Sequence, residues 1–276
     1  MDRIAWEDLA DDLKDAIERR TGLILSAQTM TAGKNSPVAA TVATAEGKTF
    51  VKGLPANDRR SASQLREAAV APLVTGISPA LYWQFEEAGW IVLGYEYVEG
   101  RHADYRPGSG DPDALLPVFT ALGEINVPDP SPFKSAEDRL RSYIPDPETL
   151  ALFKGSTLQH TDWVPYNVLV SPERPYLIDW AWPTLGAAWM DPAYWLLRLM
   201  ASGHSVQEAE RYALHVPAYA DADPEHLDVF ASANVQMWDE IERECEGRIT
   251  DWMHSVVLAA REWDNHRRNR AKVFAL

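Results

Sequence analysis

Several polar side chains lie close together in one short segment near the middle of the chain. His160, Asp162 and Asn167 fall within eight residues, and Asp179 follows Asn167 by twelve. Pro165 interrupts any regular helix or strand, so we expect Asp162 and Asn167 to lie in a loop. Asn167 opens one β-forming run and Asp179 ends the next, and a turn at 171–174 would bring both to the same end of a hairpin.

Asp162, Asn167 and Asp179 all carry side-chain oxygens that can bind a metal ion. Two carboxylates and an amide oxygen are hard ligands that suit Mg²⁺, which keeps waters and phosphate oxygens in its remaining positions. The alternative is that Asp162 and Asn167 only cap turns, and for His160 a buried, hydrogen-bonded role is expected. The other histidines are scattered without zinc-site spacing, so the sequence does not indicate a hydrolytic zinc centre.

The array resembles the catalytic and metal-binding loops of the aminoglycoside phosphotransferase family, which is related to choline kinases and, more distantly, to protein kinases. Protein kinases carry H-R-D-x-x-x-x-N and D-F-G for these tasks. The resemblance implies that Asp162 orients or deprotonates an acceptor hydroxyl, with His160 supporting the loop. It implies that Asn167 and Asp179 hold Mg²⁺ on the nucleotide phosphates, and that Asp191 braces the backbone of the loop.

A kinase also needs a lysine on the third strand of its small lobe and an acid on the following helix. Lys52 lies in the β-forming run 50–54, and Glu67 is the only acid in the helix predicted for residues 59–74. We therefore expect Lys52 to bind the α- and β-phosphates and Glu67 to hold Lys52. Taken without the downstream motif, both residues could equally be solvated surface charges.

Two further segments correspond to nucleotide-binding parts of such a lobe. The loop 31–37 has one glycine, and Asn35 and Ser36 are its candidates for covering the phosphates, with an ordinary hairpin turn as the alternative. Residues 94–100 resemble the hinge, which implies that the backbone of Glu96 and Val98 meets the purine and that Tyr95 lies behind it. ATP and GTP both remain open as co-substrates.

The elements that must position these residues differ between the two ends of the chain. Short β-forming runs at 23–29, 38–44, 49–54, 81–85 and 90–98 predict a five-stranded antiparallel sheet, with the helix 59–74 between its third and fourth strands. A loop-rich stretch follows residue 100, and most of the remaining chain has helical spacing apart from a β insert at 157–182.

We therefore predict an α+β, two-lobed, protein-kinase-like fold. The expected domains are a nucleotide-binding lobe over residues 1–95, a hinge or linker over 96–110 and a helical lobe over 111–276. The helical lobe is expected to carry the catalytic and metal loops and the acceptor site.

Charge indicates what kind of acceptor to expect. The chain of 276 residues has a formal net charge of −15, which disfavours nucleic acid and anionic membranes as partners. Residues 1–94 hold 10 basic and 12 acidic residues, whereas residues 95–276 hold 16 and 29. Acids in the helical lobe would attract a cation, although a solvated helix face is the alternative for each one. The substrate-binding candidates are Asp239, Glu240, Glu244 and Trp163.

Other properties limit the class of protein. The 46% of hydrophobic residues can form a core, and the single Cys245 excludes an internal disulfide. The sequence has no run of ~18 apolar residues and no secretory signal pattern, so we expect a cytoplasmic protein.

These observations predict a phosphotransferase that moves the γ-phosphate of ATP or GTP to a hydroxyl of a small cationic molecule, with Mg²⁺ as cofactor. An aminoglycoside-type or other basic antibiotic is the expected acceptor. A housekeeping kinase of choline, a sugar or an amino alcohol is one alternative, and a non-catalytic binding protein with a kinase-like fold is another.

Overall fold

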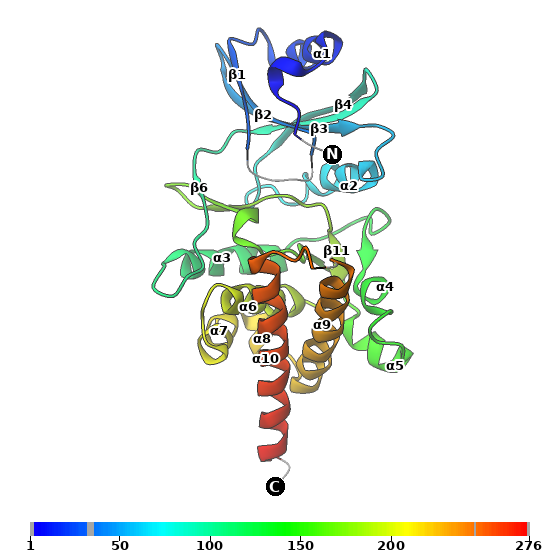
Figure 1. Ribbon diagram of the computed structural model, residues 1–276, viewed down its shortest axis with the longest axis vertical. Helices are drawn as coiled ribbons and strands as arrows, with labels where there is room; N and C mark the ends of the chain where they lie inside the picture. Colours follow the sequence, from blue (N-terminus) through cyan, green and yellow to red (C-terminus); the bar gives the residue numbers. More distant parts are fainter. Residues whose placement is uncertain (1–2, 32–35, 246, 275–276) are drawn as a thin grey trace. The chain divides into compact units, whose positions relative to one another are not determined.

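The computed structural model describes residues 3–31, 36–245 and 247–274, which form two compact units (Figure 1). The first unit contains Met1–Arg101 and Ser171–Trp182, and the second contains His102–Val170 and Pro183–Leu276. A short segment from the middle of the sequence therefore belongs to the N-terminal unit, and it carries Asp179 into that unit. The domain boundaries proposed from the sequence remain a prediction.

The first unit is built on the predicted five-stranded antiparallel sheet. Its strand order is β1-β2-β3-β5-β4, and each neighbouring pair is antiparallel. The strands are β1 (Ser26–Thr29), β2 (Val38–Thr44), β3 (Gly47–Pro55), β4 (Leu81–Glu87) and β5 (Trp90–Glu96). The other elements are a 3₁₀ turn (Trp6–Asp8), α1 (Asp11–Thr21), α2 (Ser61–Val70) and β10 (Pro175–Leu177).

Side-chain alternation in β3 separates the core from the polar face of the sheet. Val51 packs with Leu13 and Ile17 of α1 in the hydrophobic core of this unit. Because successive residues of a strand point to opposite faces, Lys52 projects away from α1. The helix α2 lies on that opposite face, where Gln64 Nε2 donates to the Ile91 carbonyl at 2.8 Å. The sheet thus places Lys52 under α2.

The predicted helix 59–74 is too long by several residues. The helix α2 covers only Ser61–Val70, and its N-cap, Arg60, makes no capping side-chain bond. Asp58 instead accepts hydrogen bonds from the backbone and the guanidinium of Arg60, so it closes a turn before the helix. A local side-chain bond has competed with helix initiation.

The second unit is mainly helical, as predicted. Its helices are α3 (Asp111–Gly123), α4 (Ala136–Leu140), α5 (Pro147–Leu150), α6 (Met190–Ala201), α7 (Val206–Ala213), α8 (Pro217–Ala220), α9 (Pro224–Glu244) and α10 (Asp251–Phe274), with 3₁₀ turns at Ala151–Phe153 and Pro165–Asn167. Its short strands include β7 (Lys134–Ser135), β8 (Thr157–Gln159), β9 (Val168–Val170) and β11 (Thr184–Gly186), and β7-β11-β8 form a small sheet. The two-residue strand β6 (Arg101–His102) falls at the boundary of the units.

The helix α6 forms the centre of this unit, because every residue from Met190 to Met200 is buried. The long helices α9 and α10 lie side by side next to it (Figure 1). None of the described helices combines the length and the apolar character needed to cross a bilayer.

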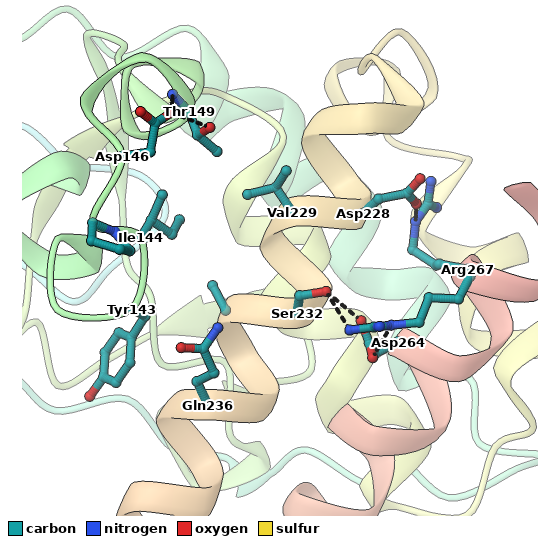
Figure 2. Close-up of a pocket in the computed structure, with 13 residues that line it drawn as sticks. Tyr143, Ile144, Asp146, Thr149, Asp228, Val229, Ser232, Gln236, Asp264 and Arg267 are labelled. Atoms are coloured by element: carbon teal, nitrogen blue, oxygen red, sulfur yellow. Dashed lines mark hydrogen bonds and ion pairs between the residues drawn. The ribbon is translucent and has the colours of Figure 1, made fainter.

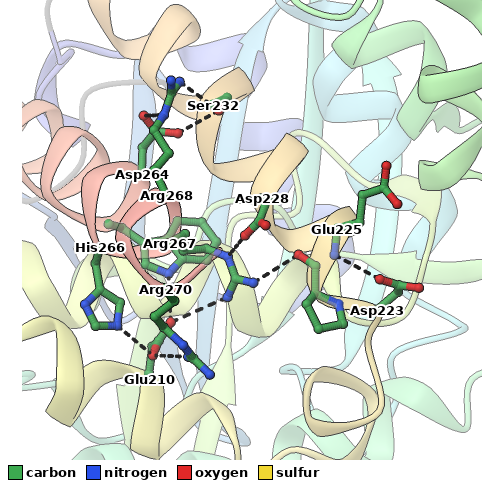
Figure 3. Close-up of polar contacts among 12 residues, drawn as sticks. Glu210, Asp223, Glu225, Asp228, Ser232, Asp264, His266, Arg267, Arg268 and Arg270 are labelled. Atoms are coloured by element: carbon green, nitrogen blue, oxygen red, sulfur yellow. Dashed lines mark hydrogen bonds and ion pairs between the residues drawn. The ribbon is translucent and has the colours of Figure 1, made fainter. Parts of the chain in front are cut away.

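Ion pairs fasten the end of α10 to its neighbours (Figure 3). Glu210 of α7 has a side chain only 9% exposed and forms ion pairs with Arg267 and Arg270 at 3.6 and 3.1 Å. Arg267 also pairs with Asp228 of α9, and Asp264 accepts from Ser232 at 2.6 Å. Arg268 pairs with Asp264 at 2.7 Å, so the arginines near the C-terminus neutralise acids on α7, α9 and α10.

Gly94 permits a close approach inside the sheet of the first unit, and this can be tested. A Cβ atom at residue 94 would lie 2.2 Å from Cε2 of Trp83, whereas one at Gly123 would meet nothing within 4 Å. We expect Gly94→Ala to lower the free energy of unfolding by about 1–3 kcal/mol, because Trp83 must move off the sheet. Gly123→Ala should change it by less than about 1 kcal/mol. Equal effects of the two substitutions in urea denaturation would contradict this account.

Candidate functional site

Lys52 is the centre of a polar cluster in the first unit. Its ammonium donates to Glu67 Oε2 at 2.7 Å and to Asp179 Oδ1 at 2.8 Å. The Lys52 and Glu67 side chains are only 13% and 7% exposed, and Asp179 is 27% exposed. The expected ion pair between Lys52 and Glu67 is therefore present, and Asp179 joins it as a second acceptor.

The protonation of this cluster follows from its burial and its charges. Burial alone would lower the pKa of Lys52, but the carboxylates of Asp179 and Glu67 raise it above its ordinary value. Burial raises the pKa of Glu67, and the Lys52 ammonium offsets part of that rise. Burial and the Glu67 carboxylate raise the pKa of the Tyr95 phenol well above its usual range. Lys52 is thus a fixed cation held by two acids.

The backbone around Asp179 is shaped to present this side chain. Asp179 has a φ of 63°, a left-handed conformation that non-glycine residues seldom adopt. The flanking residues are anchored within the same unit, since the Leu177 amide donates to the Ile77 carbonyl at 2.7 Å and Trp180 Nε1 donates to Ser78 Oγ at 2.8 Å. The strained residue is therefore held between two fixed neighbours.

In the second unit, Asp191 braces the loop that contains His160 and Asp162. The backbone amides of His160 and Thr161 donate to its two carboxylate oxygens at 2.7 and 2.8 Å. Thr161 has a φ of 69°, which is unusual for a β-branched residue. The amide of Asp191 itself donates to Gln159 Oε1 at 2.9 Å. The bracing role that the resemblance implied for Asp191 is confirmed.

Asp162 and Asn167 contact each other directly. Asn167 Nδ2 donates to both the backbone carbonyl and Oδ2 of Asp162, each at 3.0 Å. The amide nitrogen of Asn167 thus points to Asp162 and its amide oxygen points away. The Asp162 side chain is 42% exposed, and its amide donates to Nδ1 of the buried His160 at 3.3 Å. This arrangement leaves a carboxylate accessible beside an oriented amide oxygen.

Arg198 of α6 is a neighbour of Asp162 that sequence reasoning missed. Its Nη2 lies 3.7 Å from Asp162 Oδ1, and its side chain is only 6% exposed. The guanidinium carbon lies 5.1 Å from the centre of the Trp238 ring on α9. The signal available in the sequence was its position seven residues after Asp191, since such residues share one helix face.

The predicted nucleotide-binding residues outside this cluster are placed as follows. Asn35 lies outside the described residues, and Ser36 is buried just before β2. Glu96 ends β5, where its amide donates to the Ala80 carbonyl at 2.8 Å and its carboxylate accepts from the Ala80 amide at 3.1 Å. Val98 follows in a stretch without regular structure. Their nucleotide contacts stay a prediction.

The predicted substrate contact of Trp163 is wrong. Its side chain is 0% exposed and stacks on Phe119 with ring centres 4.0 Å apart. An indole that stacks inside the second unit has no surface to offer a substrate. Adjacency to Asp162 in the sequence was misleading, because neighbouring side chains in this loop point in different directions.

Two of the predicted acids of α9, Asp239 and Glu240, have partners within the second unit. Asp239 pairs with Arg261 at 2.8 Å, and Glu240 Oε2 accepts from the Tyr143 hydroxyl at 2.7 Å. Burial, Glu240 and then Glu244 raise the pKa of Tyr143 to about 12. Arg261 thus offsets the charge of Asp239, whereas the hydrogen-bond partner of Glu240 is a phenol that brings no positive charge.

A separate cavity of about 650 Å³ lies in the second unit between the 143–149 segment, α9 and α10 (Figure 2). Four of its charged groups form ion pairs, Asp228 with Arg267 and Asp264 with Arg268, and Asp146 accepts from Thr149. Among the described residues that line it, none is a predicted catalytic, nucleotide or metal residue.

The donor set for Mg²⁺ is small. Within residues 3–31, 36–245 and 247–274, no three His, Cys, Asp or Glu side chains gather into a metal site of their own. Asn167 in the second unit and Asp179 in the first each offer a hard oxygen of the kind that fits Mg²⁺ when phosphates and waters supply its other ligands. Their joint binding of an ion that arrives with a nucleotide stays a prediction.

Comparison with known proteins identifies the fold. No family model matches the sequence, and no curated protein matches it significantly. Choline kinase LicA from Streptococcus pneumoniae is similar in structure, with a TM-score of 0.64 at 18% identity over 92% of this chain and 99% of that one. The fold is protein-kinase-like.

Two other structures share this protein-kinase-like fold. A putative aminoglycoside phosphotransferase from Ralstonia eutropha has a TM-score of 0.61 at 12% identity, over 94% of this chain and 98% of that one. A thermostable mutant aminoglycoside phosphotransferase, in complex with AMP-PNP and hygromycin B, has the same score and identity over 92% and 99% of the two chains. The predicted fold class is confirmed.

The bracing carboxylate of Asp191 should make stability depend on pH. Burial raises the pKa of Asp191 from 3.8 to about 6, so the folded protein retains a proton that the unfolded chain has released between these values. The contribution of Asp191 to the free energy of unfolding therefore falls as pH rises from 4 to 6, by on the order of 3 kcal/mol, and is constant above pH 7.

Urea denaturation of the wild type and of Asp191→Asn between pH 4.5 and 7.5 measures this contribution. The stability advantage of the wild type over the variant should shrink as pH rises. An advantage that stays constant or grows would show that the folded protein binds no extra proton at Asp191.

Proposed function

We propose that the protein is a phosphotransferase that moves the γ-phosphoryl group of ATP or GTP to a hydroxyl of a small, cationic molecule. The observation that carries this proposal is the ammonium of Lys52 bridging Glu67 and Asp179 at 2.7 and 2.8 Å in a protein-kinase-like fold. Such a lysine positions nucleotide phosphates in kinases, and its acid partner fixes it.

The first unit is proposed to bind the nucleotide. Lys52 has a permanent positive charge for the α- and β-phosphates, and Glu67 keeps its side chain extended. The backbone of Glu96 and Val98 is proposed to meet the purine, with Asn35 and Ser36 near the phosphates. The similar structures support a nucleotide, since LicA has been solved with AMP and a mutant phosphotransferase with AMP-PNP.

Asp162 is proposed to act on the acceptor hydroxyl. Its carboxylate is accessible, and Asn167 fixes one oxygen by a 3.0 Å hydrogen bond, so the other can accept the hydroxyl proton. As the O–H bond breaks, the hydroxyl oxygen bonds the γ-phosphorus, and the bond from that phosphorus to the leaving diphosphate breaks. His160 is proposed to support this loop through its contact with the Asp162 amide.

Asn167 and Asp179 would hold Mg²⁺ through an amide oxygen and a carboxylate oxygen. The bound ion would neutralise charge that develops on the phosphate oxygens. Lys52 contributes beside it by holding the carboxylate of Asp179 in one orientation.

The acceptor is proposed to be a cation, with an aminoglycoside-type or other basic antibiotic as the first class. Residues 203–264 hold 14 acidic and 4 basic residues, and Trp238 brings α9 beside Arg198 and so towards Asp162. The hygromycin B complex of a similar structure supports this class. A choline-, sugar- or amino-alcohol kinase has the same catalytic residues, and the similarity to choline kinase LicA supports it equally.

A non-catalytic binding protein is the alternative from another class. Such proteins commonly lack the lysine, the base or a metal ligand, and all of these are present in this chain. Nucleotide turnover therefore separates the two possibilities.

Removal of the proposed base should strongly slow turnover. Mg²⁺-dependent transfer from [γ-³²P]ATP and GTP is to be measured over a panel of aminoglycosides, choline, amino alcohols and sugars. Asp162→Asn should lower kcat by roughly 10²–10⁴-fold, because the hydroxyl proton loses its acceptor. Asp138→Asn, at an exposed ion pair on α4, is the matched control and should keep wild-type kcat.

Two outcomes would count against the proposal. Wild-type protein that transfers no phosphate to any member of the panel is not a small-molecule kinase of this type. An Asp162→Asn variant with unchanged kcat would refute the role of Asp162.

Cation recognition predicts a separate effect on substrate binding. Glu240→Gln and Glu244→Gln should each raise KM for the best cationic acceptor by about 3–10-fold, because each removes one attractive charge. KM for ATP should stay within twofold, and Glu148→Gln on the exposed part of α5 is the control. Equal KM values for the acceptor in all variants would exclude these two acids from the acceptor site.

A further inference from the structure

The helix α6 reaches the loop 160–167 at two points. Asp191, in its first turn, accepts from the backbone amides of His160 and Thr161. Arg198 lies seven residues later, which places it on the same face about two turns along the helix. Its guanidinium faces the side chain of Asp162 at 3.7 Å. One helix face thus contacts both the backbone of the loop and its accessible carboxylate.

The two oxygens of Asp162 have different partners. Oδ2 accepts from Asn167 Nδ2 at 3.0 Å, and Oδ1 faces Nη2 of Arg198 at 3.7 Å. Rotation of the carboxylate about its Cβ–Cγ bond would weaken both contacts. Asn167 and Arg198 together therefore restrict the direction in which Asp162 presents its lone pairs.

Arg198 is poorly arranged to stabilise the fold. In the described part of the chain, its buried Nε and Nη1 atoms have no hydrogen-bond partner. Burial lowers the pKa of Arg198, and the Asp162 carboxylate offsets part of this effect. A buried charge with one distant ion pair is normally less stable than an apolar side chain of the same size. A residue that costs stability at this place points to a role in the site.

We infer that Arg198 is a positioning residue. It holds the carboxylate of Asp162 in the orientation in which Asp162 can take the proton of the substrate hydroxyl. The inference rests on the proposed function. Arg198 transfers no proton itself, and its guanidinium also contacts the Trp238 ring, with 5.1 Å between the guanidinium carbon and the ring centre.

The test replaces Arg198 by methionine, which keeps the length and the packing on Trp238 but removes the charge. We expect Arg198→Met to lower kcat at least tenfold, to leave KM for the nucleotide within twofold, and to keep or raise Tm. Arg198→Lys should recover part of the lost kcat, because it returns a positive charge. Arg211→Met, at an exposed position on α7, is the control and should match the wild type.

A merely structural role gives a different pattern. It predicts a lower Tm for Arg198→Met with kcat of the folded fraction unchanged, and this result would overturn the inference. So would a kcat within twofold of wild type. If Arg198→Met does not fold, Arg198→Gln takes its place. Its kcat is again expected to fall at least tenfold, while KM for the nucleotide stays within twofold.

A second measurement separates this inference from the proposed function. In ¹H–¹⁵N spectra, the Asn167 side-chain amide reports the position of the Asp162 carboxylate. Arg198→Met should shift or broaden this resonance, whereas the backbone amides of His160 and Thr161, held by Asp191, should stay in place. An inactive wild type would refute the proposed function, and an unchanged Asn167 resonance would refute the positioning role of Arg198 in either case.

Discussion

The buried ammonium of Lys52 between two carboxylates is the interaction on which the first unit depends. Such a charge is tolerated only while it is paired, and loss of one partner of a buried pair typically costs about 3–5 kcal/mol. Glu67 belongs to α2, and Asp179 belongs to a segment that is 127 residues away from Lys52 in the sequence. One cation on β3 therefore ties a helix and an inserted segment to the sheet.

The second unit has the opposite arrangement, because it keeps an anion, Asp162, accessible instead of burying a cation. Asp162 stays accessible while Asn167 and Arg198 limit its movement, and Asp191 fixes the backbone that carries it. The loop residue Thr161 has an unfavourable backbone conformation that this bracing maintains. In both units a charged side chain is held by partners from distant elements, so its direction is a property of the fold and not of the local sequence.

Local patterns predicted much of this arrangement. Alternating β-forming runs indicated the five strands, and the resemblance to the kinase pattern implied the ion pair between Lys52 and Glu67. Contacts made by distant segments were not predictable in this way. Nothing in the sequence near Asp179 shows that residues 171–182 join the first unit, and Arg198 looks like any arginine on a helix. Trp163 was misassigned because position beside Asp162 says nothing about side-chain direction, and the start of α2 was placed too early because Asp58 closes a turn with Arg60.

The arginines at the end of α10 act as internal counterions for a strongly acidic group of helices. Glu210 and Asp264 are shielded from solvent, whereas their partners Arg270 and Arg268 are 54% and 64% exposed, so salt reaches these pairs from the arginine side. The exposed acids on α9 and α10, which are Glu225, Glu244, Asp251 and Glu262, repel one another through water, where salt screens effectively. Salt thus relieves this repulsion and affects the pair between Arg267 and Glu210 least, because both of these side chains are shielded.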